Sequence, residues 1–398
     1  MNTIMMQSFV KFVGKVYSKF QWSFNKYFFK LKNYFNKRIF KMKLIITSFT
    51  LFLAICLQTV EAAKILVDQT SSQYTTLTQA ISAATSGDTI IVYPGTYSGF
   101  TTSVSKNLTI IGTNPLGNDG NIGSAGSTIF SSGIIYSNSN NYFRFMNCYV
   151  QGSIDVTANT GSVNYNIVQN GEVEINNAQT FEVLNNFVDN SSGVDAIDVN
   201  NSSNVTVAGN IIKTTSSSSS GEGIAITGDN NLVTNNVVFG YYYAIFFTSS
   251  SNSIVINNII YDAYQYAIYC SVSSQTNVIA NNCQYSSPSG FVISPATQDG
   301  GGNLNNVDPN FTTLNTTFQF GSSNLTLLPG SPCIDSGNAL LTDIDGSASD
   351  MGVYGGISPF NSEFIKFLPE IVALGVTPVI VAPGGNVTVS GSAKTIGQ

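Results

Sequence analysis

Acidic side chains occupy equivalent positions of successive short apolar segments in this chain. Asp155, Glu174 and Asp198 each stand between two Ile or Val residues, and Phe246 and Tyr269 hold the same middle position further along. The middle residue of such a strand faces away from the core, so these five side chains share one outer face. Stacked carboxylates repel each other, and a hard divalent cation relieves the repulsion. The pattern predicts a Ca²⁺ site at Asp155, Glu174 and Asp198; the alternative is a solvated acidic face that opposes sheet-to-sheet aggregation.

Tyrosines form a second candidate surface. Tyr243 and Tyr266 recur 23 residues apart. Together with Phe246 and Tyr269 they predict a platform on which sugar rings stack, because aromatic faces favour such contacts. An aromatic ladder that only stabilises the edge of the repeat explains the same residues.

A repeat with a period in the low twenties must position these side chains. Its marker is a set of asparagines with spacings of 20, 24, 26, 22 and 24 residues, namely Asn166, Asn186, Asn210, Asn236, Asn258 and Asn282. Short alternating segments of Ile and Val accompany them, which indicates several strands per repeat and no helix. This favours an all-β parallel β-helix with stacked asparagines hydrogen-bonded along it. A leucine-rich repeat is disfavoured because Leu is sparse.

Composition excludes several functions. The chain has no histidine, so catalytic triads and metal sites that depend on His are absent. From Ala63 onward, six basic and 21 acidic residues give a net charge of −15. This charge disfavours nucleic acid and anionic membranes as partners, and acidic polysaccharides unless a cation bridges them.

The N-terminal region has the character of a targeting segment. Residues 1–41 are basic and aromatic, and residues 42–62 read as a signal peptide with a short apolar core and a small-residue cleavage pattern. We expect 1–41 to be an extension that is not translated and the mature protein to be secreted or held at the cell surface. A membrane contact is expected only if segment 42–60 remains as an uncleaved anchor. Nine glycosylation sequons suit a secreted glycoprotein.

The start of the mature chain resembles a known family. An amphipathic segment at 74–84 predicts a short helix that caps the open N-terminal end. That helix, the sequence SGDTIIVYPGTY at 86–97, the Asn-rich coils and the motifs LPGSPCIDSG at 328–337 and DMGVYGG at 350–356 resemble the pectin-lyase-like superfamily. The resemblance covers about residues 64–357 and implies a right-handed parallel β-helix. It leaves function open, because the superfamily has many activities and some members with none.

The resemblance also suggests a catalytic alternative. Lyases of the superfamily bind Ca²⁺ with stacked acids, and an Arg or Lys abstracts the proton next to a uronate carboxylate. Arg144 and Lys213 are the candidate bases, although neither lies in a segment that matches a lyase motif. Polygalacturonase-like hydrolysis is disfavoured because it uses a histidine.

The C-terminal part is expected to close the solenoid. We predict the β-helix at 63–295, further coils and a cap at 296–357, and a linker with the start of a truncated β-sandwich module at 358–398. Four cysteines, Cys148, Cys270, Cys283 and Cys333, permit two disulfides in three pairings, and inert core cysteines are as good an interpretation.

Two functions therefore remain. The favoured one is a secreted or surface β-helix protein that binds a polysaccharide or cell-surface glycan, or serves a structural role. The alternative is a Ca²⁺-dependent polysaccharide lyase.

Overall fold

A computed structural model describes residues 11–34 with short gaps, 62–70, 73–191, 193–214, 221–294, 296–314, 318–356, 358–360, 370–377 and 388–394. The chain divides into two units, 1–61 and 62–398, which are considered separately. The described residues between 11 and 34 are helical. The predicted signal peptide, apart from Ala62, lies outside the described residues. No helix in the described part of the chain is long and apolar enough to cross a membrane.

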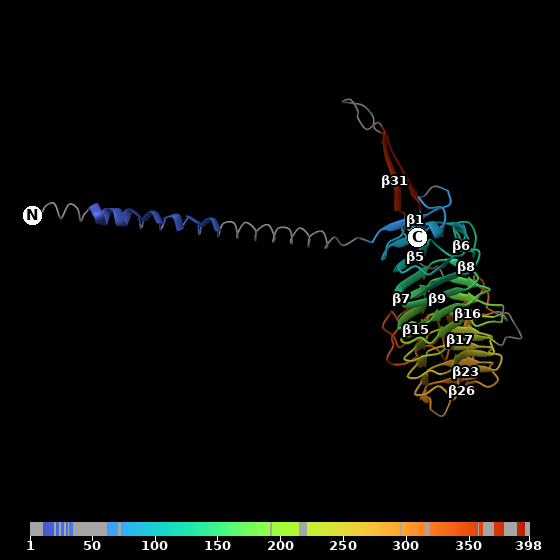
Figure 1. Cartoon of the computed structure of the whole chain (residues 1–398). Helices are drawn as coiled ribbons and strands as arrows, with labels where there is room; N and C mark the ends of the chain where they lie inside the picture. The colour runs from blue at the N-terminus through green and yellow to red at the C-terminus, as the bar shows by residue number, and fades with distance from the viewer. Residues whose placement is uncertain are drawn as a thin grey trace, which may run out of the picture. The chain divides into compact units, whose positions relative to one another are not determined.

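The second unit is an all-β solenoid of stacked parallel strands (Figure 1). An 18-stranded sheet, sheet A, and a 10-stranded sheet, sheet B, form its walls. Sheet A contains β1 (Lys64–Val67), β2 (Thr89–Val92), β4 (Thr101–Thr102), β5 (Leu108–Gly112), β7 (Ile134–Met146), β9 (Ile154–Asn164), β11 (Val173–Asn176), β12 (Thr180–Leu184), β14 (Ile197–Asn200), β15 (Val205–Ala208), β17 (Glu222–Ile226), β18 (Leu232–Thr234), β20 (Tyr243–Phe247), β21 (Ile254–Ile256), β23 (Tyr266–Cys270), β24 (Val278–Ala280), β26 (Phe291–Val292) and β27 (Gln298–Gly301). Sheet B contains β3 (Gly95–Tyr97), β6 (Thr128–Phe130), β8 (Tyr149–Gln151), β10 (Ile167–Gln169), β13 (Phe187–Asp189), β16 (Ile211–Lys213), β19 (Val237–Phe239), β22 (Ile259–Tyr261), β25 (Cys283–Tyr285) and β28 (Leu304–Asn305). The predicted parallel β-helix is confirmed.

The N-terminal end of the solenoid is covered by helix α2 (Leu77–Ala83), as the amphipathic pattern predicted. Thr76 caps the helix by accepting a hydrogen bond from the Gln79 amide through its hydroxyl. Leu77 and Ile81 are buried in the same core cluster as the inward Ile and Val of the first coils. The helix therefore shields apolar core that the first coil would otherwise expose to water.

Buried asparagines form a continuous hydrogen-bonded ladder through the middle of the solenoid. The Asn236 side-chain oxygen accepts from both the backbone amide and the side-chain amide of Asn210, at 2.9 Å each. Asn236 in turn donates to Asn258, at 3.0 Å from both of its amide nitrogens. The same pattern links Asn166, Asn186, Asn210, Asn236, Asn258, Asn282 and Asn303. The predicted asparagine ladder is confirmed, and Asn303 extends it by one rung.

A second row of asparagines precedes the ladder and turns the backbone. Asn185, Asn235, Asn257 and Asn281 have φ between 52° and 60°, the left-handed region that Asn tolerates better than most residues. Their side chains point outward and bind the chain that follows the last coil. Asn235 donates to the carbonyls of Asp350 and Gly352 at 2.9 and 3.1 Å.

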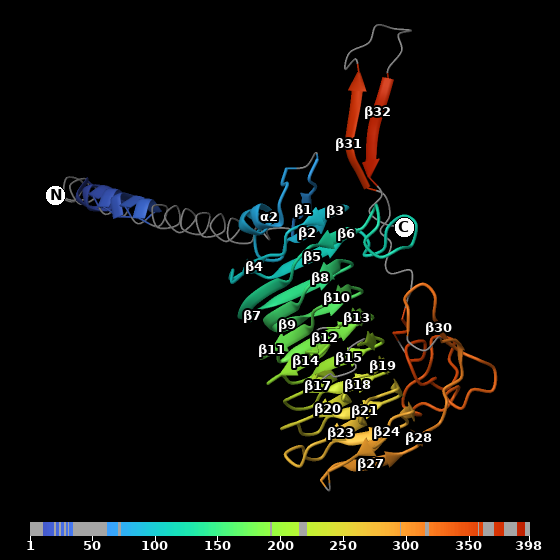
Figure 2. The same cartoon turned by 90° about the vertical axis from the view of Figure 1, so that its right-hand side faces the viewer.

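The C-terminal segment 307–360, called the strap below, covers the outer face of sheet B (Figure 2). It includes the antiparallel pair β29 (Phe311–Thr313) and β30 (Asn324–Leu327). Phe318 stacks on Phe239 of sheet B at a ring-centroid distance of 5.5 Å. The strap runs back along the coils, since Ser336 binds Asn281 whereas Ser358 binds Asn185. Beyond it, β31 (Glu370–Thr377) and β32 (Thr388–Lys394) form an antiparallel hairpin.

The ladder predicts the effect of one substitution. Asn236→Ala removes the acceptor of two buried Asn210 donors, so we expect the free energy of unfolding to fall by roughly 3 kcal/mol. Asn140→Ala, at an exposed position, is the matched control and should change it by less than about 0.5 kcal/mol. Denaturant unfolding followed by circular dichroism measures both. Equal stability of the two variants would contradict a stabilising ladder.

Candidate functional site

The structure brings the three predicted metal ligands into one row on the outside of sheet A. Glu174 on β11 is in register with Asp155 on β9 and with Asp198 on β14. Neighbouring parallel strands are about 4.8 Å apart, so the three carboxylates stack on successive coils. Inward Ile and Val on either side of each acid are fully buried, and this fixes the outward direction of the carboxylates.

Further acids flank this row, just before or at the start of β11, β14 and β17. Asp195 accepts a hydrogen bond from the Glu222 backbone amide at 2.7 Å. Glu172 lies two residues before Glu174, a spacing that places both side chains on one side of an extended chain. The period-two spacing was present in the sequence, but the prediction did not use it for Glu172. The six carboxylates, called the acid face below, are Asp155, Glu172, Glu174, Asp195, Asp198 and Glu222.

Burial and mutual repulsion disfavour the charged form of several of these groups. Burial raises the pKa of Glu172 to about 7, and the neighbouring carboxylates raise it further. Burial likewise raises the pKa of Asp198 to about 6. Burial, followed by the hydrogen bond and charge of Asp195, raises the pKa of Glu222 to about 8. The acid face is therefore only partly ionised at neutral pH.

Two asparagine amides donate into the acid row. Asn176 donates to Asp155 at 3.3 Å. Asn200 donates to Asp198 at 2.7 Å and to Glu174 at 3.3 Å. Carboxylate oxygens, such as those that accept these hydrogen bonds, are ligands that Ca²⁺ prefers. Within the described ranges, however, no three acidic or cysteine side chains are grouped closely enough to hold a metal ion. The carboxylate oxygens of the row are of the donor type that Ca²⁺ takes, and a Ca²⁺ site here stays a prediction.

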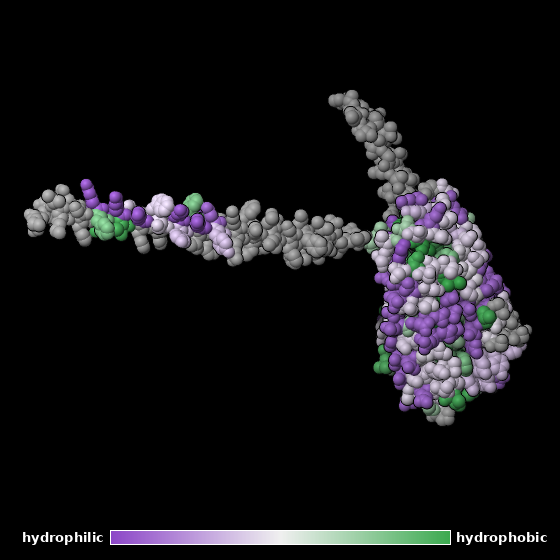
Figure 3. All heavy atoms as spheres, viewed as in Figure 1, coloured by the Kyte–Doolittle hydropathy of each residue, from purple (hydrophilic) through white to green (hydrophobic). Residues whose placement is uncertain are grey.

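Aromatic side chains continue the same face on the next coils. Glu222 is in register with Tyr243, which is in register with Tyr266. The Tyr243 and Tyr266 rings stack at 5.0 Å with 8° between their planes, and Phe246 and Tyr269 stack at 5.8 Å. The four rings are half-buried, so each keeps part of its surface open to solvent. In Figure 3, strongly hydrophilic atoms gather over the middle coils, where Figure 1 carries the label β17.

The two candidate bases are not part of the acid row. Arg144 on β7 is in register with Ser162, which lies seven residues beyond Asp155 along β9. Lys213 ends β16 of sheet B and pairs with Asp189 at 3.2 Å. Its ammonium group is thus engaged by a carboxylate outside the acid face. Neither residue is brought beside Asp155, Glu174 and Asp198 by strand register.

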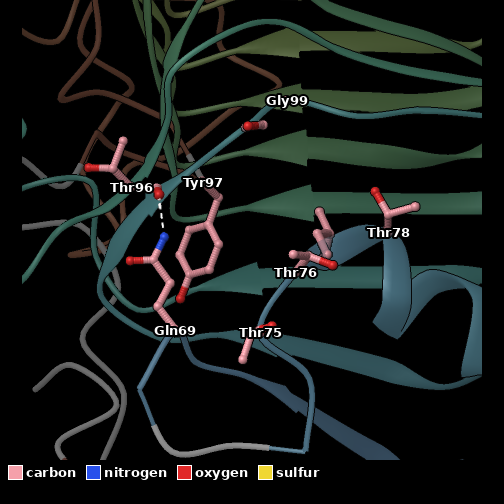
Figure 4. Close-up of a pocket in the computed structure, with 9 residues that line it drawn as sticks. Gln69, Thr75, Thr76, Thr78, Thr96, Tyr97 and Gly99 are labelled. Carbon is pink, nitrogen blue, oxygen red and sulfur yellow. Dashed lines mark hydrogen bonds between the residues drawn. The ribbon is translucent and has the colours of Figure 1, made fainter.

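A cavity of about 370 Å³ lies at the N-terminal end, between the turn before α2 and the end of β3 (Figure 4). Gln69 donates to the Thr96 carbonyl across it. Hydroxyl groups of Thr75, Thr76 and Thr78 make up much of the remaining lining. None of the lining residues is charged.

The acid face makes stability depend on pH. Because the pKa of Glu222 rises from 4.5 to about 8 on folding, the folded chain binds more protons than the unfolded chain between these values. The contribution of Glu222 to the free energy of unfolding therefore falls as the pH rises from 4.5 to about 8. Glu222→Gln should raise the melting temperature by about 3 °C at pH 8 and leave it unchanged near pH 4. The exposed control Glu182→Gln should show no such difference. Calorimetry across this pH range measures both, and a pH-independent effect of Glu222→Gln would refute the electrostatic explanation.

One family model agrees with the architecture over part of the chain. Residues 172–312 match the family model described as right handed beta helix region. No curated protein matches the chain. Among solved structures, the crystal structure of pectate lyase Pel9A aligns with 14% identity and a TM-score of 0.45, covering 74% of this chain and 96% of that one. The stacked parallel coils of the second unit form a right-handed parallel β-helix, the fold that the resemblance implied, and the family model matches part of it.

Proposed function

We propose that this protein binds a polysaccharide or cell-surface glycan along the outer face of sheet A, across the acid face and the aromatic pairs that follow it. The observation that carries the proposal is the register of two adjoining rows on this face. Glu222 is in register with Tyr243 and Tyr266, and Asp198 is in register, through Ala225, with Phe246 and Tyr269. An extended ligand lying along the stacked coils contacts one new side chain of the row at each step.

The side chains on this face suit sugars. Half-buried rings such as Tyr243 and Phe246 offer apolar faces for sugar rings. Carboxylates accept hydrogen bonds from hydroxyl groups, and the partly protonated Glu222 and Glu172 also donate. The reduced ionisation of the acid face lessens its repulsion of an acidic glycan.

Ca²⁺-dependent lyase activity is the second candidate. A cation bound by Asp155, Glu174 and Asp198 would offset the repulsion between carboxylates that adds to burial in raising the pKa of Asp198, and would attract a uronate carboxylate. β-Elimination also needs a base, and neither Arg144 nor Lys213 lies in the acid row. We therefore rank binding above catalysis, and we place the protein outside the cell or at its surface.

Tyr266→Ala tests the binding surface. The substitution removes one ring from the Tyr243 stack, and we expect the dissociation constant for a bound glycan to rise about tenfold. Tyr264→Ala is the matched control, because Tyr264 is exposed and lies outside the stacked pairs. Affinity electrophoresis in gels containing xylan, β-glucan, pectate or alginate, with Ca²⁺ or with chelator, measures retention.

The same samples distinguish the two functions. Retention without a rise in the ultraviolet absorbance of unsaturated products supports a binding protein. A chelator-sensitive rise in absorbance that is lost in Asp198→Ala supports the lyase. Neither retention nor product with any of the four polysaccharides would refute the proposal.

A further inference from the structure

Two cysteines meet where the strap crosses the last coils. Cys283 lies on β25, in register with Ile259 and Leu304, and its side chain faces outward from sheet B into the layer beneath the strap. Cys333 belongs to the strap and is buried in the same cluster. Both side chains are fully buried, and both cysteines are free thiols in this structure.

Contacts of the strap residues Met351 and Gly352 position Cys333 relative to Cys283. The strap residue Gly352 binds the Asn257 carbonyl at 2.7 Å and lies so close to Ile259 that an added Cβ would be 2.7 Å from its side chain. Ile259 immediately precedes Cys283 in the outward row of sheet B. Met351, next to Gly352, donates to the Cys333 carbonyl at 3.0 Å. Strap and sheet therefore place Cys333 over the Cys283 rung.

The two thiols also interact directly. A hydrogen bond with Cys333, together with burial, raises the pKa of the Cys283 thiol. A thiol held in this way is unreactive in the folded chain, because the thiolate is the nucleophile. Oxidation must therefore take place during folding, before the strap has covered the pair.

We propose that Cys283 and Cys333 form a disulfide when the chain folds in an oxidising compartment, and that this bond fixes the strap to the last coils. The oxidant is a disulfide such as oxidised glutathione. The thiolate of one cysteine attacks it, releasing one reduced thiol, and the second cysteine then displaces the other. In total two protein thiols lose two electrons and two protons, one S–S bond forms in the protein, and one S–S bond of the oxidant is reduced to two thiols.

The structure does not support any other disulfide among the four cysteines. Cys148 immediately precedes β8, whereas Cys270 lies on β23 of sheet A, which follows β22, and β22 is five sheet-B strands beyond β8. At about 4.8 Å per coil they are roughly 24 Å apart, far beyond the reach of a disulfide. Both also belong to the interior core, whereas Cys283 and Cys333 belong to the layer under the strap. Of the three pairings open to the sequence, the structure supports one bond, between Cys283 and Cys333, and leaves Cys148 and Cys270 as core thiols.

The bond would join elements that are distant in the chain. It closes a loop with 49 residues between the two cysteines, and long closed loops lose the most entropy in the unfolded state. The strap otherwise depends on Asn side chains and on aromatic contacts such as Phe318 with Phe239. This inference is independent of the proposed glycan-binding function.

The test is refolding of the full chain in a buffer of oxidised and reduced glutathione. The product is denatured, alkylated and weighed, and its linked peptides are identified after digestion with pepsin, because the span from 270 to 333 contains no Lys or Arg. We expect the wild type to lose two alkylation sites and to yield a peptide pair linked through Cys283 and Cys333. Cys270→Ser, the matched buried control, should lose the same two sites, whereas Cys333→Ser should not form this bond.

The stability of the wild type, oxidised against reduced, provides a readout that does not depend on whether the variants fold. Oxidised wild type should melt roughly 5 to 10 °C above the same protein treated with reductant, and its strap should resist proteolysis longer. Cys333→Ser should melt at the same temperature in both conditions. Full alkylation of Cys283 and Cys333 in the oxidised wild type, or a bond from either of them to Cys148 or Cys270, would overturn the proposal.

Discussion

The buried asparagine ladder is the interaction on which the solenoid depends. Each side-chain amide binds backbone carbonyls near the ends of the sheet A strands, as when Asn236 donates to the carbonyls of Val207 on β15 and Thr234 at the end of β18. A turn packed against an apolar core would otherwise leave these polar groups without partners. Because every rung also binds the next, the ladder sets the spacing and register of the coils. The alignment of the outer rows follows from that register.

The asparagines with left-handed backbone conformation form the surface on which the strap docks. Asn235 and Asn257 precede ladder residues, so the turn that directs one amide into the coil directs its neighbour outward, where it is buried beneath the strap. Their outward amides bind strap backbone at Asp350 and Asn338. The Asn-Asn pairs therefore serve two purposes, one inside the coil and one beneath the strap. The strap in turn covers apolar side chains of sheet B that would otherwise face water.

Sequence periodicity predicted the parts of the fold that repeat. Spacing alone revealed the ladder, the inward Ile and Val, and the register of Asp155, Glu174 and Asp198, because one rule governs every coil. It did not reveal the path of the strap. That path depends on single contacts, such as Gly352 against Ile259, between segments 93 residues apart. Such contacts leave no period in the sequence, so only the three-dimensional arrangement showed which cysteines meet.

In the candidate site, too, the sequence predicted the repeated positions but not the interactions between particular residues. Residue types and period-two spacing were sufficient to place carboxylates and rings on one face, but not to show how they influence one another. The raised pKa of Glu222 depends on Asp195, which lies 27 residues earlier and reaches it across one coil. A solenoid that stacks like charges in register must offset their repulsion, through protonation, through amide donors such as Asn200, or through a ligand. The regular core permits this electrostatic cost, because the ladder and the apolar interior hold the strands in place irrespective of what the outer face carries. That separation of a stabilising interior from a variable exterior is why the fold could be inferred from the sequence more firmly than the function.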